Sequence, residues 1–136
     1  MRATLSKNDR LHLQKRIDYL FAAGKSAVFY PIRVVAVPAA DDLLDVREVE
    51  PALQTLFSVA KKRFKRAVQR NRHKRRMREA YRLEKAVADW NPSTPVWLAL
   101  QYIGNEEIPL PELRAAIRKA VEKGLDLAHE STPSRP

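Results

Sequence analysis

Apolar residues recur along this chain at two different spacings, which predict helices in some segments and strands in others. Leu13, Ile17, Leu20 and Phe21 return at close to every fourth position, as on one face of a short amphipathic helix. Gly24 stands where such a helix commonly ends. The pattern therefore predicts one helix near the start of the chain.

Three segments are rich in β-branched and aromatic residues and predict strands. They span 27–37, 53–60 and 96–103. The last is almost continuously apolar, which is typical of a strand near the centre of a sheet. Pro31 cannot donate a ladder hydrogen bond, so we expect it at an edge, at a bulge or at the beginning of its strand. The acidic segment 39–51 reads as a surface connection, and its residues 45–49 could pair as an edge strand.

Two longer segments predict helices that pack on this sheet. The segment 65–88 has no Pro or Gly, and one of its sides must face the sheet. Pro109, Pro111 and Glu112 form a helix-start signature ahead of the second segment. The side of the first helix expected in the core carries His73, Met77, Ala80, Tyr81, Glu84, Val87 and Ala88. The core stripe expected for the second consists of Leu113, Ala116, Ile117, Ala120, Val121 and Leu125.

The element order is therefore α-β-β-(β)-α-β-α. A single sheet with its helices on one face satisfies this order, so we expect an α+β fold, a two-layer α/β sandwich. A chain of 136 residues is long enough for one domain and too short for two. We expect that domain to span 1–128 and a frayed tail to follow at 129–136.

Positive charge is concentrated in one window of the chain. The net charge is +10, from 26 basic and 16 acidic residues, and residues 61–82 contain twelve Lys or Arg against the single acid Glu79. The remaining 14 basic and 15 acidic residues give a net charge of −1 outside that window. Such a local cationic face indicates a polyanionic partner, most simply the phosphates of nucleic acid.

Several other functions are excluded by composition. The chain has no Cys, so a disulfide framework, Cys-ligated zinc and a thiol nucleophile are ruled out. Its N-terminus lacks the apolar core of a secretory signal, and no apolar run approaches the roughly 18–20 residues of a membrane span. His12, His73 and His129 are scattered, and 3 glycines cannot supply a P-loop. We therefore expect no catalytic and no metal-ligating side chains, and we expect a cytoplasmic protein.

Arginine suits the binding of nucleic acid because its planar fork of donors matches phosphate oxygens and can also stack on bases. The basic residues 61–63 precede a helix N-terminus, which adds backbone N–H donors and the positive end of the helix dipole. If six to eight phosphates are neutralised, the log–log dependence of affinity on salt should have a slope of roughly −4 to −7. His73 lies on the predicted core side and is expected to serve packing or hydrogen bonding.

The stretch FSVAKKRFKRAVQRNRHKRRMREAYRL, residues 57–83, resembles the signature region of the protein subunit of bacterial ribonuclease P. That signature has a strand ending in Ser-Val-x-Lys-Lys, then Ala-Val, Arg-Asn-Arg, Lys-Arg and Arg-Glu-Ala followed by an aromatic residue. The motifs at 70–72, 74–75 and 78–81 match it in order and spacing. Phe64 stands where the family commonly has Gly. The resemblance extends to Arg10-Leu11, to Phe21-x-x-Gly24-Lys25-Ser26, to the late strand and to the final helix.

The resemblance implies an α/β sandwich with a left-handed βαβ crossover through the basic helix. It also implies a subunit that assists a catalytic RNA, with its Mg²⁺ ions, in removing the 5′ leader of precursor tRNA; no cofactor is expected on the protein alone. The implied cleft between the first helix and the sheet, which holds the leader, has Ile17, Phe21 and Ser58 at its floor. The residues implied to face the catalytic RNA are Lys61, Lys62, Arg70, Asn71, Arg72, Lys74, Arg75 and Arg78.

Three other functions compete with this interpretation. A ribosomal or general RNA-chaperone protein without a processing role has the same composition, and only the ordered motif separates the two. A DNA-binding basic-region helix would need leucine heptads, but the chain reaches Asn91-Pro92 soon after Leu83. Peripheral membrane binding would need a bulky apolar face that the basic helix lacks. We therefore expect neither DNA nor membrane as a partner.

Overall fold

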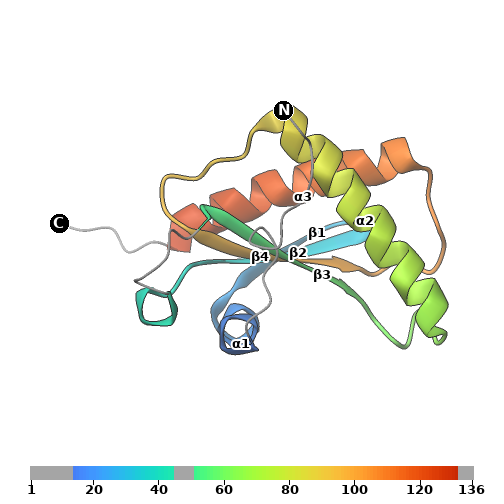
Figure 1. Ribbon diagram of the computed structural model, residues 1–136, viewed down its shortest axis with the longest axis horizontal. Coiled ribbons are helices and arrows are strands. Elements are labelled where there is room, and N and C mark those ends of the chain that lie inside the picture. Colours follow the sequence, from blue (N-terminus) through green and yellow to red (C-terminus); the bar gives the residue numbers. More distant parts are fainter. Residues whose placement is uncertain (1–13, 45–50, 132–136) are drawn as a thin grey trace.

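A mixed β-sheet lies at the centre of the computed structural model, which describes residues 14–44 and 51–131 (Figure 1). Its strands are β1 (Lys25–Phe29), β2 (Ile32–Pro38), β3 (Leu53–Val59) and β4 (Val96–Tyr102), in the spatial order β1-β2-β4-β3. The β1–β2 and β2–β4 pairs are antiparallel, and β3–β4 is parallel. The expected central position of the 96–103 strand is confirmed, since β4 has a hydrogen-bonded neighbour on each side.

The segment 27–37 forms two strands instead of the single strand that its composition predicts. The chain turns at Tyr30 and Pro31, and β1 folds back on β2 with Phe29 opposite Ile32. Pro31 has no N–H to donate, which suits a turn better than the interior of a ladder. The split provides the third strand before the basic helix. The other candidate for that strand, residues 45–49, lies outside the described residues.

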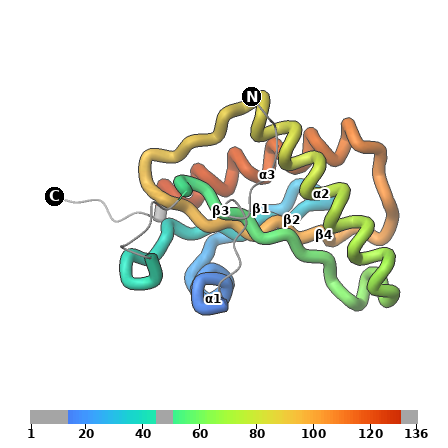
Figure 2. Tube along the Cα trace, in the orientation of Figure 1, coloured from blue at the N-terminus to red at the C-terminus, as the bar shows by residue number. Residues whose placement is uncertain are grey.

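Helices cover both faces of the sheet (Figures 1 and 2). The long helices α2 (Ala67–Ala88) and α3 (Leu110–Ser131) lie on one face, and α1 (Gln14–Ala23) lies on the other with the short 3₁₀ turn η2 (Asp41–Leu43). The mixed α+β class is confirmed, whereas the prediction that all helices share one face is wrong for α1. The reason is that β2 and β4 bury side chains on both sides, so the second face also needs a cover.

Two apolar clusters correspond to the two faces. The larger joins α2 and α3 to the sheet through residues such as Met77, Ile117 and Leu98. The smaller joins Leu20 of α1 to Val35, Val37, Trp97 and Ala99. We call the side that carries the smaller cluster the α1 face of the sheet. The residues predicted for the leader cleft belong to this face.

The core side predicted for the basic helix is confirmed over most of its length. His73, Met77, Ala80, Tyr81 and Glu84 are buried. Val87 and Ala88 are exposed instead, because they lie in the last turn of α2, and Trp90 beyond the helix end packs on Tyr81 with ring centroids 5.6 Å apart.

The final helix, α3, extends beyond residue 128, where the domain was predicted to end. Its predicted core residues are buried, except for Leu125, which is half-buried. The expected tail began at His129, but α3 continues to Ser131. Residues 132–136 lie outside the described residues. The parallel pair β3–β4, connected through α2, supplies the expected βαβ unit.

Candidate nucleic-acid interface

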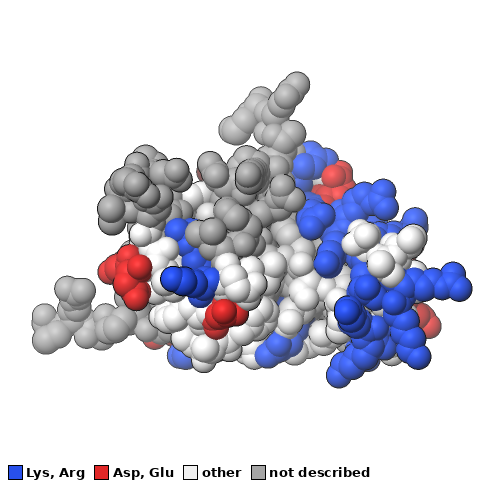
Figure 3. Space-filling model, turned by 60° about the horizontal axis from the view of Figure 1, so that its bottom comes forward, with Lys and Arg blue, Asp and Glu red and all other residues white. Residues whose placement is uncertain are grey.

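The twelve basic residues of the 61–82 window lie on one connected part of the molecule, the N-terminal two thirds of α2 and the loop before it. Lys and Arg side chains gather at the right of the view in Figure 3. We call residues 61–66 the basic loop. Seven of the twelve side chains belong to exposed residues: Lys61, Lys62, Arg63, Lys65, Arg66, Arg72 and Arg75. Together these seven define the cationic surface.

The basic loop is anchored to the core by its single apolar residue. Phe64 is only 8% exposed. Its ring stacks on His73, with centroids 4.1 Å apart and an interplanar angle of 29°, and lies 6.1 Å from the ring of Tyr102. The rings of His73 and Tyr102 also pack together, with centroids 4.6 Å apart. This aromatic cluster links the loop, α2 and β4, so the five cations around Phe64 project from a fixed backbone.

Arg70 also holds the basic loop in place. Its Nη1 donates to the carbonyl oxygens of Phe64 and Lys65, each at 2.8 Å. Arg63 Nη1 donates to Oδ1 of Asn105 at 3.0 Å, which ties the loop to the segment after β4. Arg70 was predicted to contact RNA, and in the structure it is half-buried and bonded to the backbone of the basic loop. We infer that Arg70 shapes the basic loop as well as contributing charge.

The eight residues predicted to contact RNA divide into two groups by exposure. Exposed ones are Lys61, Lys62, Asn71, Arg72 and Arg75, while Arg70, Lys74 and Arg78 are half-buried. The exposed group lies on the basic loop and on the first turns of α2. The N–H groups at the start of a helix point out of its N-terminal end, and the N-cap residue Arg66 of α2 makes no side-chain cap bond to them. The structure thus brings the exposed group together around one helix N-terminus.

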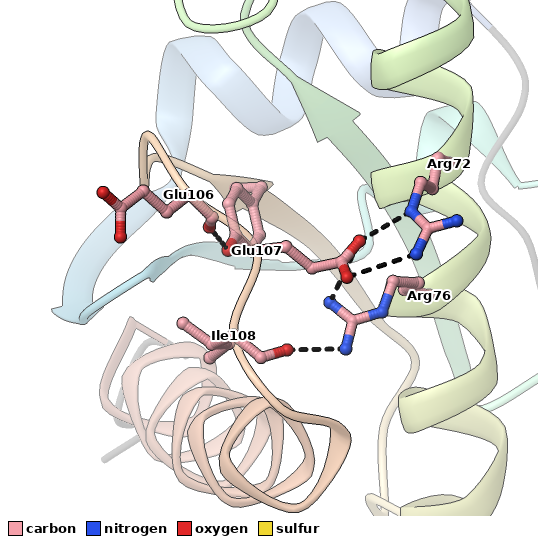
Figure 4. Close-up of polar contacts among 6 residues, drawn as sticks. Arg72, Arg76, Glu106, Glu107 and Ile108 are labelled. Carbon is pink, nitrogen blue, oxygen red and sulfur yellow. Dashed lines mark hydrogen bonds and ion pairs between the residues drawn. The ribbon is translucent and has the colours of Figure 1, made fainter.

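Two arginines of α2 contact the segment that follows β4 (Figure 4). Arg72 donates to both carboxylate oxygens of Glu107, from Nε at 2.6 Å and from Nη2 at 3.2 Å. Arg76 donates from Nη2 to the carbonyl oxygen of Ile108 at 2.5 Å, and its Nη1 lies 4.0 Å from Oε1 of Glu107. The hydrogen bond from Arg72 lowers the pKa of Glu107, so this carboxylate is charged at neutral pH.

Burial lowers the pKa of His73 below its ordinary value of 6.5, and the nearby Arg76 and Arg72 lower it further against the opposing effect of Glu107. The unfolded chain therefore takes up this proton at a higher pH than the folded chain does. Acidification below about pH 6.5 should favour unfolding.

We expect the free energy of unfolding to fall as the pH is lowered from 7.5 through 6.5, and part of that fall to disappear in His73→Leu. Urea unfolding at a series of pH values measures both proteins, and the difference between them isolates the histidine from the carboxylates that titrate at lower pH. An identical pH dependence in the two proteins would show that His73 does not titrate between the folded and unfolded states.

The residues predicted for the leader cleft lie on the α1 face of the sheet. Ile17 is half-buried and packs against the smaller cluster, and Phe21, one turn later, is 43% exposed. Ser58 lies two residues after Leu56 in β3, and Leu56 packs on that same cluster, so the Ser58 side chain belongs to the same face. The structure thus places all three on one side of the sheet, where α1 lies beside a strip of half-buried strand residues.

Two further polar residues belong to that strip. Ser58 lies opposite Gln101 of β4, and Gln101 lies opposite Arg33 of β2. Arg33 Nη1 donates to Oε1 of Gln101, and both residues are half-buried. Neither residue was predicted from the sequence, although Arg33 is the one charged side chain of β2 and Gln101 interrupts an otherwise apolar run in β4. Next to them, Val28 of β1 is 56% exposed.

The described residues contain no group of three or more His, Asp or Glu side chains close enough to hold a metal ion. None of the helices in that part of the chain combines the length and apolar character needed to cross a membrane.

Comparisons with known proteins agree on one family. The sequence model of the ribonuclease P family matches residues 5–123. The ribonuclease P protein component of Porphyromonas gingivalis strain W83 is 38% identical over 133 residues, covering 96% of this chain and 90% of the relative. That of Chlorobium phaeobacteroides is 42% identical over 82 residues, covering 60% of this chain and 54% of the relative.

Solved structures of ribonuclease P proteins share the fold. The protein from Thermotoga maritima superposes with a TM-score of 0.63 at 18% identity, covering 84% of this chain and 96% of that one. The protein from Staphylococcus aureus gives 0.60 at 14% identity, covering 85% and 94%. On the family match and the identity to the curated relatives, the chain belongs to the ribonuclease P protein family.

Proposed function

We propose that this chain docks on the catalytic RNA through its cationic surface and holds the 5′ leader of precursor tRNA on the α1 face of its sheet. Membership of the family makes the chain the protein subunit of ribonuclease P, with the ribonuclease P RNA as its partner. The residues that make the contact, and the contact with precursor tRNA, are what we propose beyond that.

The observation that carries the docking proposal is the fixed orientation of the cationic surface. Flexible basic tails also bind RNA, but these cations project from a loop anchored by the Phe64 ring and by Arg70. Pre-positioned cations lose less conformational entropy on binding, and arginine forks can match successive phosphates. The exposed members Lys61, Lys62 and Arg75 are the strongest candidates for phosphate contacts.

The leader proposal rests on the strip of half-buried polar residues on the α1 face. Phe21 offers an exposed ring on which a base can stack, while Arg33, Gln101 and Ser58 offer polar groups to an extended single strand. Ile17 is aliphatic, so it can pack against a base but cannot stack as an aromatic ring does. The basic loop follows β3, the strand that carries Ser58, so the two proposed contacts are joined by a short piece of chain.

We further propose that the RNA subunit holds the Mg²⁺ ions and performs hydrolysis in the cytoplasm. The described residues offer no metal-ligating cluster to which a catalytic ion could be assigned. The role of the protein is then binding and positioning.

Reconstitution tests this function directly. The purified protein, mixed with a bacterial ribonuclease P RNA at low Mg²⁺, should increase the rate of cleavage of precursor tRNA over that of RNA alone. It should also raise the affinity for precursor tRNA more than the affinity for mature tRNA, because only the precursor has a leader. No gain in cleavage would contradict the processing role and favour a general RNA-binding protein. A gain without discrimination between the two tRNAs would contradict the leader contact alone.

A further inference from the structure

Glu107 is an acid built into the edge of the cationic surface. It lies in the segment between β4 and α3, and its carboxylate points at α2 between Arg72 and Arg76 (Figure 4). Arg72 meets it with two parallel hydrogen bonds, from Nε at 2.6 Å and Nη2 at 3.2 Å. The pair is open to solvent, with side-chain exposures of 60% for Arg72 and 40% for Glu107.

The backbone on both sides of Glu107 is held in place. The Tyr102 hydroxyl donates to the carbonyl oxygen of Glu106, and Arg76 donates to the carbonyl oxygen of Ile108. The backbone that carries Glu107 is therefore held next to α2, which keeps its carboxylate within reach of Arg72.

A carboxylate that accepts two bonds from one edge of a guanidinium occupies the position that a phosphate would take. Arg72 is an exposed member of the cationic surface and belongs to the motif expected to contact RNA. A phosphate and Glu107 cannot bind the same edge of Arg72 at once, and their negative charges repel each other.

We propose that Glu107 occupies the phosphate-binding edge of Arg72 in the free protein, and that RNA binding exchanges this carboxylate for a backbone phosphate. The proposal rests on the proposed docking of RNA on the cationic surface. Glu107 is then an internal competitor that weakens RNA binding at Arg72.

The exchange has a signature in the salt dependence. A phosphate that pairs with a free cation releases counterions from the RNA, which steepens the salt dependence by about 0.7–0.9 for each contact. When the phosphate displaces Glu107, the freed carboxylate stays beside the RNA and its negative charge retains part of the local cation atmosphere, so the net release is smaller. Arg72 in the natural protein thus contributes affinity with a reduced salt dependence.

Glu107→Gln should therefore bind ribonuclease P RNA about two- to ten-fold more tightly, since an exposed ion pair no longer has to be broken and a like charge is removed. Its log–log salt slope should steepen, by at most about 0.7–0.9. Filter binding or fluorescence anisotropy over a KCl series measures both quantities.

Glu106→Gln is the matched control. It removes the same charge from the neighbouring position, but the Glu106 carboxylate points away from Arg72 and Arg76 in Figure 4. Its backbone carbonyl, which accepts from Tyr102, is kept. If the negative charge acted only over long range, both variants would change equally in RNA affinity and in salt slope. That result would overturn the exchange. Weaker binding by Glu107→Gln would overturn it as well, because the carboxylate would then be positioning Arg72 for RNA.

Separate measurements test the exchange at Arg72 and the proposed function. The same titrations with a polyuridine oligonucleotide show whether the natural protein prefers ribonuclease P RNA, which tests the function. The difference between the two Gln variants on whichever RNA binds tests the exchange.

Discussion

Phe64→Ala should destabilise the protein by about 3–5 kcal/mol, the usual cost of truncating a buried phenylalanine. The ring stacks on His73 and lies 6.1 Å from the ring of Tyr102, and the alanine would leave a cavity beside them. The basic loop would also lose its single apolar anchor, so its five cations would no longer be held in one arrangement. We therefore expect weaker binding to ribonuclease P RNA, even at temperatures at which the variant remains folded. Urea unfolding gives the stability, and RNA titration below the unfolding transition gives the affinity.

Ile117→Ala separates loss of the anchor from general loss of stability. Ile117 is fully buried in α3 against the same sheet face, and its truncation should cost about 2–5 kcal/mol. It has no part in holding the basic loop. We expect the folded Ile117→Ala protein to bind RNA as the natural protein does. Equal affinities for the Phe64→Ala and Ile117→Ala variants would show that the loop keeps its arrangement without the Phe64 ring.

The role of Phe64 shows where the sequence stops being informative. In the chain it reads as a departure from a family pattern that commonly has Gly there, inside a run of cations that all point to solvent. Its burial depends on His73 in α2 and Tyr102 in β4, which are brought to it only by the fold. The sequence placed His73 on the core side of its helix but could not tell which residue it would meet.

Local periodicity predicted the elements well because each depends on neighbours in the chain. The basic helix, the β4 strand and the core stripe of α3 all follow from one apolar side repeating at the right interval. The side on which α1 packs could not be predicted in this way. The signal was present in β2 and β4, whose apolar residues lie on both faces and so require a cover on each.

The pairing of Arg72 with Glu107 could not be predicted from the sequence, for a different reason. Charge composition identified a cationic window with a single internal acid, Glu79. It could not show that an acid from beyond β4 would meet that window, because the contact joins positions 35 residues apart. For the same reason, Arg70 reads as a phosphate contact in the sequence, while in the structure it also donates to the backbone of the basic loop.

Gly24→Ala should lower the stability of the protein, because an added methyl group at this position would clash with neighbouring atoms. The residue directly follows α1, and an added Cβ would lie 2.4 Å from the carbonyl oxygen of Leu20 and 2.6 Å from Cγ1 of Val35. The first of these atoms is backbone, so α1 or β2 must move. Overpacking of this kind usually costs about 1–3 kcal/mol, and more where backbone is displaced. Gly24 was expected as a helix end, and the structure shows that it also allows the close approach of α1 to the sheet.

A shift of α1 would carry Ile17 and Phe21 away from the strip of Ser58, Gln101 and Arg33. We therefore expect the reconstituted Gly24→Ala enzyme to lose its preference for precursor over mature tRNA, while RNA docking through the cationic surface is retained. Gly124→Ala is the matched control, since its Cβ would lie 2.9 Å from Cδ2 of Leu98 and 3.0 Å from Cγ2 of Val34, on the opposite face. These are ends of side chains that can adjust, and alanine favours the helix by about 1 kcal/mol. If Gly24→Ala folds and keeps its preference for the precursor, the leader does not depend on the position of α1, and the leader contact must lie elsewhere.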